Sequence, residues 1–223
     1  METSRPLPFT TARIEDGIPW FWEEHEARIQ AASVALGLNL PRPNAMRAAL
    51  PRVVGGSMRL RMTAQPDGSV VAEAAPYEPP SEPWTLKVVP VDHDADAVRH
   101  KTTARTMYDA ARNAAPDHDD ALLVDLDGRV LETTIANVVV QIDGDLRTPP
   151  STLALLPGIA RARLLEAGVA EAVIDETELR RAEAVCVCNA LMGVHPVGRI
   201  GDESPMESGD LARHLHGSLR IQG

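Results

Sequence analysis

Apolar and polar residues alternate in several short runs along this chain, and a period of two is typical of half-buried β-strands. Residues 9–14 form the first run, and an E-D-G turn leads from it into a second short strand. Two further runs, 58–64 and 69–75, flank the sequence Q-P-D-G and predict a hairpin. Residues 21–37 and 43–49 have apolar positions at helical spacing instead, so we expect two helices there.

The second half of the chain mixes predicted strands and helices without a regular β-α-β order. We expect strands at 85–90, 121–126, 130–142, 172–175 and 184–189, and helices after Lys101, before Gly168, at 177–181 and at 210–219. A D-G turn joins two of these strands in a second hairpin. This mixed order favours the α+β class over a doubly wound parallel sheet.

A proline-rich segment separates the two halves. Residues 77–84 read Y-E-P-P-S-E-P-W, which excludes a helix or a central strand. We therefore predict a small N-terminal α/β domain at 1–78, a linker at 79–84 and a larger C-terminal domain at 85–223.

Composition and charge exclude several classes of function. The formal net charge is −10 and no basic run occurs, which argues against a nucleic-acid partner. The apolar stretches are too short to span a membrane and the N-terminus has no apolar signal core, so we expect no membrane contact and a cytoplasmic protein. Cys186 and Cys188 match no zinc-binding spacing, so we expect buried free thiols and no metal site.

The two lysines are the least common basic residues in the chain. Arginines number 20 and lysines two, Lys87 and Lys101. Unlike a guanidinium, an amine can lose its proton near neutral pH and attack a carbonyl. Lys87 alternates with Leu86 and Val88, as expected for the polar face of a strand, whereas Lys101 lies between a predicted strand and a predicted helix, from which it could project into a cleft. Spacing alone leaves both an ordinary and a chemical role open for Lys101.

Three other features could act together with Lys101. Glu132 follows a hairpin turn, P-G-I-A-R at 157–161 opens a helix whose first amides could bind a phosphate, and Arg28 lies three residues after His25 on the first helix. Each also has an ordinary interpretation: a solvated strand glutamate, a simple helix start and a solvated helix flank. Together, an amine, an acid, a phosphate seat and an arginine are the components of a pyridoxal-phosphate site.

These residues lie in segments that resemble the class IV aminotransferases, the pyridoxal-phosphate enzymes of fold type IV. The resemblance covers roughly residues 9–200 and is carried by F-T-T-A-R-I-E-D-G, H-E-A-R-I, H-K-T-T-A-R, V-L-E-T-T-I-A-N, L-L-P-G-I-A-R and V-C-V-C-N-A-L-M. It implies an α+β fold of two domains with pyridoxal 5′-phosphate bound between them, and a homodimer.

The resemblance also implies a role for each site residue. Lys101 is the implied Schiff-base lysine and proton shuttle, Glu132 the partner of the pyridine nitrogen, and Asn137 a structural residue beside it. The implied phosphate contacts come from Arg28, Gly158, Ile159, Ala160, Asn189 and Ala190. Many family members have Ser or Thr where Ala190 stands, so that contact would use backbone amides, helped by Asn189.

The reaction remains open between two chemistries of the same family. The segment C-N-A-L-M resembles the corresponding segment of 4-amino-4-deoxychorismate lyases of the folate pathway, which release 4-aminobenzoate and pyruvate. The alternative is amino-group transfer between an amino acid and a 2-oxo acid. A third hypothesis is a non-catalytic dimeric relative, motivated by the few residues before Phe9. The substrate is expected to be a small amino-acid-like molecule, and Arg59, Arg61 and Arg105 are candidates for binding its carboxylate.

Overall fold

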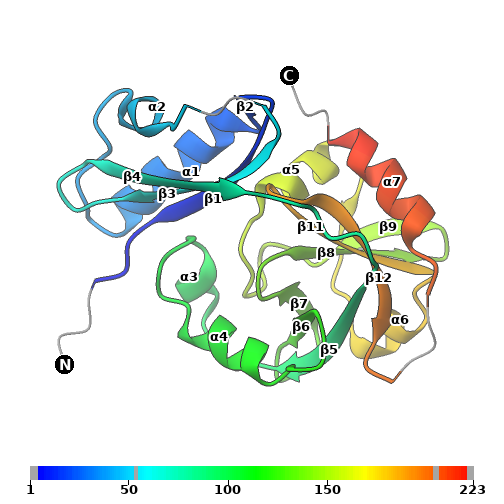
Figure 1. Ribbon diagram of the computed structural model, residues 1–223. Coiled ribbons are helices and arrows are strands. Elements are labelled where there is room, and N and C mark those ends of the chain that lie inside the picture. Colours follow the sequence, from blue (N-terminus) through cyan, green and yellow to red (C-terminus); the bar gives the residue numbers. More distant parts are fainter. Residues whose placement is uncertain (1–4, 53–54, 203–205, 220–223) are drawn as a thin grey trace. The chain divides into compact units, whose positions relative to one another are not determined.

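The computed structural model describes residues 5–52, 55–202 and 206–219, and contacts divide these residues into two compact units (Figure 1). The first unit contains residues 5–79, as far as they are described, and His100–Arg105; the second contains Pro80–Arg99 and the described residues from Thr106 onward. The predicted boundaries at 1–78 and 85–223 assign the segment around Lys101 to the C-terminal domain. By its contacts, however, this segment belongs to the first unit.

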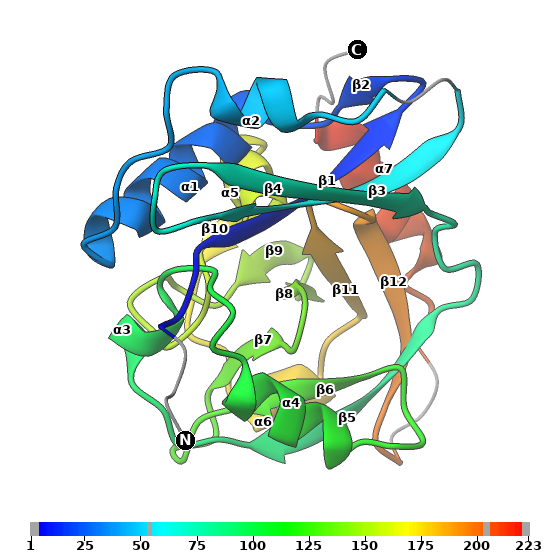
Figure 2. The ribbon, with the colours of Figure 1, turned by 60° about the vertical axis from the view of Figure 1, so that its left-hand side comes forward.

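Within its described residues, the first unit has one four-stranded antiparallel sheet in the order β2-β1-β3-β4. The elements are β1 (Phe9–Glu15), β2 (Ile18–Pro19), α1 (Trp22–Ala35), α2 (Ala45–Ala49), β3 (Ser57–Ala64) and β4 (Val70–Pro76). Alternate residues of β1 and β3 form the core with α1, because Ala12, Ile14, Leu60 and Met62 face Ile29. Figure 2 shows α1 (blue) along one side of these strands. The predicted strands, hairpin and two helices of this half are confirmed.

The second unit has eight strands within its described residues, in the order β10-β9-β8-β11-β12-β5-β6-β7. They are β5 (Trp84–Pro90), β6 (Asp120–Val124), β7 (Val130–Thr133), β8 (Asn137–Ile142), β9 (Asp145–Thr148), β10 (Ala170–Glu171), β11 (Ala184–Asn189) and β12 (Gly193–Ile200). An additional pairing of β7 with β8 closes the ring formed by β8, β11, β12, β5, β6 and β7. Because the ring is closed, every residue of β6 and β7 is buried, and so are all residues of β8 except Gln141.

Helices of the second unit lie between and after these strands (Figure 1). They are α3 (Ala95–Val98), α4 (Thr106–Asn113), α5 (Ile159–Glu166), α6 (Glu176–Arg180) and α7 (Gly209–Ser218). Helix α6 begins with a capping box, in which the Asp175 side chain accepts from the Glu178 amide and the Glu178 side chain accepts from the Asp175 amide. Helix α5 packs on β11, and α7 packs on β12.

The structure differs from the predicted elements at several places, and the short elements α3, β9 and β10 were not predicted. The run 130–142 is two strands, because Thr133 N donates to Ala136 O (2.7 Å) and turns the chain between β7 and β8. The helix after Lys101 begins only at Thr106. The predicted strand 172–175 is wrong, since Asp175 caps α6 instead, and β12, which contains a proline, was not predicted.

Candidate active site

The backbone around Lys101 is held by the start of the first unit's sheet. Phe9 N donates to Lys101 O (3.0 Å), Leu7 N to Thr103 Oγ1 (3.0 Å) and Thr103 N to Leu7 O (2.9 Å). Pro8 and Thr102 form an isolated antiparallel bridge. These bonds draw the segment away from helical geometry, which explains why α4 starts later than its sequence suggests. They also fix the position of Lys101 relative to β1.

The Lys101 side chain lies against an aromatic ring of the same unit. Its Nζ is 5.0 Å from the centroid of Phe9, which is buried with 3% of its surface exposed. An ammonium at this distance from a ring face is a cation–π contact. Lys87, in contrast, is exposed on β5 and donates from Nζ to Ala114 O (2.9 Å). The structure therefore supports the ordinary interpretation of Lys87 and places Lys101 in a partly enclosed position.

Helix α1 brings a buried histidine and Arg28 toward Lys101. His25 is completely buried, and its Nδ1 shares a 2.5 Å hydrogen bond with Thr10 Oγ1 of β1. The pKa of His25 is lowered to about 3, mainly by burial and also by the positive charges of Arg28 and Lys101. Both cations must lie near the imidazole to act on it. The first unit thus gathers Arg28, His25 and Lys101.

Glu132, the acid of the predicted site, is buried and accepts hydrogen bonds at both of its carboxylate oxygens. It is 3% exposed on β7, and its Oε1 accepts from Tyr108 Oη (2.7 Å) and from Leu156 N (3.0 Å). Its Oε2 accepts from Asn137 Nδ2 (3.2 Å), because the turn between β7 and β8 sets Glu132 opposite Asn137 in the register. Acceptor groups surrounded by donors are typical of the ionised carboxylate. The sequence patterns did not predict Tyr108 as a partner of Glu132.

Asn137 also connects Glu132 to the predicted phosphate seat. Its Nδ2 donates to Leu156 O (2.8 Å) as well as to Glu132. A Cβ on Gly158 would overlap the Asn137 Oδ1, so the backbone at this point passes closer than any side chain would allow. Gly158 is the N-cap of α5 and makes no side-chain cap bond. The amides of Ile159 and Ala160 are in the first turn of the helix, where the helix itself supplies no acceptor.

Asn189 and Ala190, the predicted phosphate contacts at the end of β11, lie in a turn that the Asn189 side chain stabilises. Asn189 Oδ1 accepts from Leu191 N and Met192 N, both at 2.9 Å, and its Nδ2 donates to Ile135 O (3.2 Å). Ala190 is buried. Because Cys188 pairs with Asn137 across β11 and β8, this turn follows the strand next to Asn137. The second unit therefore brings Glu132, Gly158, the first turn of α5 and the end of β11 together.

The two cysteines and the charged clusters give no metal site within the described residues. Cys186 and Cys188 are free and buried, and burial raises the pKa of both thiols to about 12. No group of three or more His, Cys, Asp or Glu side chains among the described residues could hold a metal ion. None of the described helices is long and apolar enough to cross a membrane.

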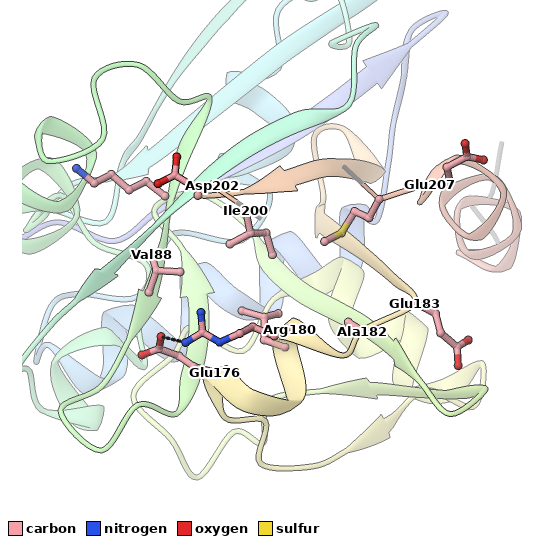
Figure 3. A pocket seen from close by; sticks show the side chains of 12 residues that line it. Val88, Glu176, Arg180, Ala182, Glu183, Ile200, Asp202 and Glu207 are labelled. Atoms are coloured by element: carbon pink, nitrogen blue, oxygen red, sulfur yellow. Dashed lines mark hydrogen bonds and ion pairs between the residues drawn. The ribbon is translucent and has the colours of Figure 1, made fainter. Parts of the chain in front are cut away.

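A cavity of about 680 Å³ lies in the second unit, and none of the predicted site residues lines it (Figure 3). It is bounded by the middle of β5, by α6 and by the end of β12 with the residues that follow it. On α6, which forms part of the cavity wall, Arg180 and Glu176 point toward one another, and Arg180 Nη2 lies 3.5 Å from Glu176 Oε2. Such a half-exposed ion pair on one helix turn contributes little to stability.

Comparisons with known proteins place the chain in one family. Residues 8–200 match the amino-transferase class IV family. A Thermotoga maritima protein named as a branched-chain-amino-acid aminotransferase is 34% identical over 113 residues, 48% of this chain and 41% of that protein. A Vibrio harveyi aminodeoxychorismate lyase is 30% identical over 130 residues, 54% of this chain and 48% of the lyase. The matched segments thus span less than half of each of these two relatives.

A solved structure gives the same result over nearly its whole length. The crystal structure of a Mesorhizobium loti protein described as an amino-acid aminotransferase has a TM-score of 0.79 and 31% identity, and the match covers 87% of this chain and 99% of that one. The predicted α+β class with fold type IV is confirmed by the family match and by the likeness in fold to a fold IV transaminase from Curtobacterium pusillum, with a TM-score of 0.83 and 22% identity over 98% of this chain and 85% of that one. This chain belongs to the class IV aminotransferase family, whose members depend on pyridoxal 5′-phosphate.

Proposed function

We propose that this chain binds pyridoxal 5′-phosphate and acts as a 4-amino-4-deoxychorismate lyase, releasing 4-aminobenzoate and pyruvate. The observation that carries the cofactor part of the proposal is the Glu132 carboxylate, fixed in a buried position by Tyr108, Asn137 and the Leu156 amide. A buried, ionised acid held by three donors is suited to keeping a heteroaromatic nitrogen protonated.

The residues present fit the cofactor in both units. In the second unit, the close approach of Gly158 to Asn137 leaves a bare backbone turn before α5, where amides can approach a phosphate. In the first unit, Arg28 supplies a half-buried cation, and Lys101 supplies an amine held by its backbone bond to Phe9. When bound, pyridoxal phosphate supplies a ring that accepts electrons from the carbon skeleton of an attached amine.

Each of these side chains then has a distinct task. Lys101 would be the covalent attachment point of the cofactor, and its Nζ would take and return a proton during the reaction. Glu132 holds a proton at the ring nitrogen. Arg28 and the amides of Ile159 and Ala160 hold the phosphate, with the positive end of the α5 dipole beside it. Ala190 and Asn189 remain proposed phosphate contacts, although the Asn189 side chain already stabilises its own turn.

The choice of reaction rests on finer features. The sequence C-N-A-L-M at 188–192 supports the lyase, and so does the 30% identity to a Vibrio harveyi lyase. The second candidate is transfer of an amino group to a 2-oxo acid, which is favoured by the 34% identity to the Thermotoga maritima protein. Both reactions use the same lysine, acid and phosphate seat. We also propose a homodimer in the cytoplasm, which sedimentation of the purified protein and cell fractionation would test.

An absorbance scan of the purified protein with added cofactor tests the proposal. The wild type should acquire the visible band of lysine-bound cofactor, and Lys101→Ala should lack it. Lys87→Ala is the matched control, because it removes the other lysine from an exposed strand position and should retain the band. A wild type without the band would instead support the non-catalytic relative. A Lys101→Ala protein with the full band would refute the role of Lys101.

The reaction is then settled by product analysis of the loaded wild type. We expect pyruvate release from aminodeoxychorismate without any added 2-oxo acid. If pyruvate appears only when a 2-oxo acid acceptor is supplied, or if amino transfer is the faster reaction, the transaminase is correct and the lyase is not.

A further inference from the structure

We infer that His25 on α1 is a positioning residue for the Lys101 amine, because its bond to Thr10 fixes the start of β1, to which the Lys101 backbone is tied. The inference rests on the proposed function, since it takes Lys101 as the attachment point of the cofactor. It requires no contact between His25 and the cofactor, because the effect passes through the first unit's own sheet.

The bond between His25 and Thr10 lies in the buried interface between α1 and the first unit's sheet. Both residues are completely buried, and Thr10 Oγ1 lies 2.5 Å from His25 Nδ1. Ile29, one helical turn after His25, packs in the apolar core with Ala12 of β1. Apolar packing has no preferred direction and tolerates a small shift of the strand, whereas a hydrogen bond requires a narrow range of distance and angle. The bond therefore fixes the position of Thr10 relative to α1.

Phe9, the residue before Thr10, connects this position to Lys101. Phe9 N donates to Lys101 O (3.0 Å), and the centroid of the Phe9 ring lies 5.0 Å from Lys101 Nζ. Successive side chains of a strand point to opposite faces, so Thr10 points toward α1 and Phe9 toward the other face of the sheet. A displacement of Thr10 would consequently move both the donor that holds the Lys101 carbonyl and the ring on which the amine packs.

His25 holds Thr10 without adding a positive charge beside Lys101. The pKa of His25 is lowered to about 3, mainly by burial and also by the positive charges of Arg28 and Lys101. The imidazole is therefore neutral near pH 7. A charged side chain at this position would add a third cation to Arg28 and Lys101, and its repulsion would act on the amine.

The buried imidazole lowers the stability of the first unit in another respect. Its Nε2 has no hydrogen-bond partner among the described residues, and a buried polar atom without a partner destabilises the folded state. An apolar side chain of similar size would avoid this cost and fill the same space in the core. The contribution that such a side chain lacks is the bond to Thr10.

Two ligands separate a role in positioning Lys101 from a role in binding the cofactor or in stabilising the fold. Pyridoxal 5′-phosphate reacts with the lysine amine and gives the visible band. Pyridoxine 5′-phosphate has an alcohol in place of the aldehyde, so it carries the same ring and phosphate but cannot react. The rate of band formation and the dissociation constant of pyridoxine 5′-phosphate would be measured on cofactor-free protein, the first by absorbance and the second by calorimetry.

Four variants test the bond. Thr10→Val and His25→Leu break it from opposite sides, and Thr10→Val does so with a side chain of the same shape. Thr10→Ser is the matched variant that keeps the hydroxyl group. Ser33→Ala is the control within α1, because Ser33 is completely buried and its Oγ has no hydrogen-bond partner among the described residues. Denaturant unfolding checks that each variant is folded, and if His25→Leu is not, the two Thr10 variants decide the test.

We expect Thr10→Val and His25→Leu to form the band roughly 10-fold more slowly than the wild type, because the amine is no longer held in place. Both should bind pyridoxine 5′-phosphate within about 3-fold of the wild type, since this ligand does not react with the amine. Thr10→Ser and Ser33→Ala should resemble the wild type in both measurements.

Three results would overturn the inference. If Thr10→Val forms the band at the wild-type rate, the bond does not position the amine. If its affinity for pyridoxine 5′-phosphate falls as much as its rate, the bond supports the cofactor site or the fold in general and not Lys101 in particular. A wild type that forms no band refutes the proposed function and this inference with it, whereas the first two results leave the proposed function intact.

Discussion

Glu132 in the second unit and His25 in the first are both buried polar side chains, but the protein satisfies them very differently. Glu132 receives three hydrogen bonds from three separate segments of the chain. His25 shares one bond with Thr10, and its buried Nε2 has no partner among the described residues. Hydrogen bonds therefore hold Glu132 in position in the second unit. In the first unit, the buried Nε2 of His25 lacks a hydrogen bond, and this lowers the stability of the folded state.

This contrast teaches that the two halves of the predicted site have different sources of rigidity. In the second unit, hydrogen bonds fix the acid directly. In the first unit, Arg61 and Lys101 pack on the ring of Phe9, and the nearby His25 imidazole is neutral at pH 7. Changes in the second unit should therefore affect chemistry and positioning, and changes in the first should be sensitive to charge and pH.

The largest effect is expected from removing the charge of Glu132. In Glu132→Gln the new amide group faces donors, and the cofactor nitrogen loses its anionic partner, so turnover should fall roughly 10²- to 10⁴-fold. Steady-state kinetics of the loaded enzyme measure this loss. Glu183→Gln is the control and should retain activity, because Glu183 is an exposed acid whose one hydrogen bond within the described part of the chain comes from Gly144 N (3.1 Å). Comparable turnover in both variants would contradict the role of Glu132.

Gly158→Ala should break the close approach between the α5 turn and Asn137. The added Cβ overlaps the Asn137 Oδ1, and moving that side chain breaks its bonds to Glu132 and Leu156 O. We expect a loss of about 1–3 kcal/mol in unfolding free energy and weaker cofactor binding. Denaturant unfolding and cofactor titration measure the two effects. Gly217→Ala, in α7, has open space around its Cβ and should lower neither quantity.

His25 should make the protein less stable as the pH falls. Its folded pKa of about 3 lies below the unfolded value of 6.5, so between these pH values the unfolded chain binds a proton that the folded chain does not. Stability attributable to this group falls by about 1.4 kcal/mol per pH unit below pH 6.5 and levels off below pH 3. Unfolding between pH 7 and 5 should show a shallower pH slope in His25→Gln than in the wild type. An equal slope in both would contradict the buried neutral imidazole; His214→Gln, exposed on α7, controls for loss of an imidazole elsewhere.

The smallest effect is expected from Tyr108→Phe. This change removes one of three donors to Glu132 and leaves the ring in place, so it should cost about 0.5–1.5 kcal/mol of stability and reduce turnover only a few-fold. Thermal unfolding and kinetics measure the change. Tyr77→Phe, whose hydroxyl has no hydrogen-bond partner among the described residues, should be neutral by comparison. A loss as large as that of Glu132→Gln would mean that Tyr108 contacts the reacting groups itself.

The candidate site could be proposed from the sequence because such a proposal depends on residue type. Lys101 is conspicuous as one of two lysines, and Glu132 and Gly158 stand in segments that resemble a known family. The hairpin of β3 and β4 and the helix α1 were also predictable. Each depends on turn residues or periodicity within a few positions, which act locally.

Only the tertiary structure decided which of these residues meet. The break after Thr133 sets Glu132 opposite Asn137, and the segment of Lys101 joins the first unit through bonds such as the one between Leu7 and Thr103, 96 residues apart. The shared stack of Arg61 and Lys101 on Phe9 follows from the same long-range pairing. Local patterns carry no record of such contacts, because pairing between distant segments is chosen by the packing and hydrogen bonding of the whole chain.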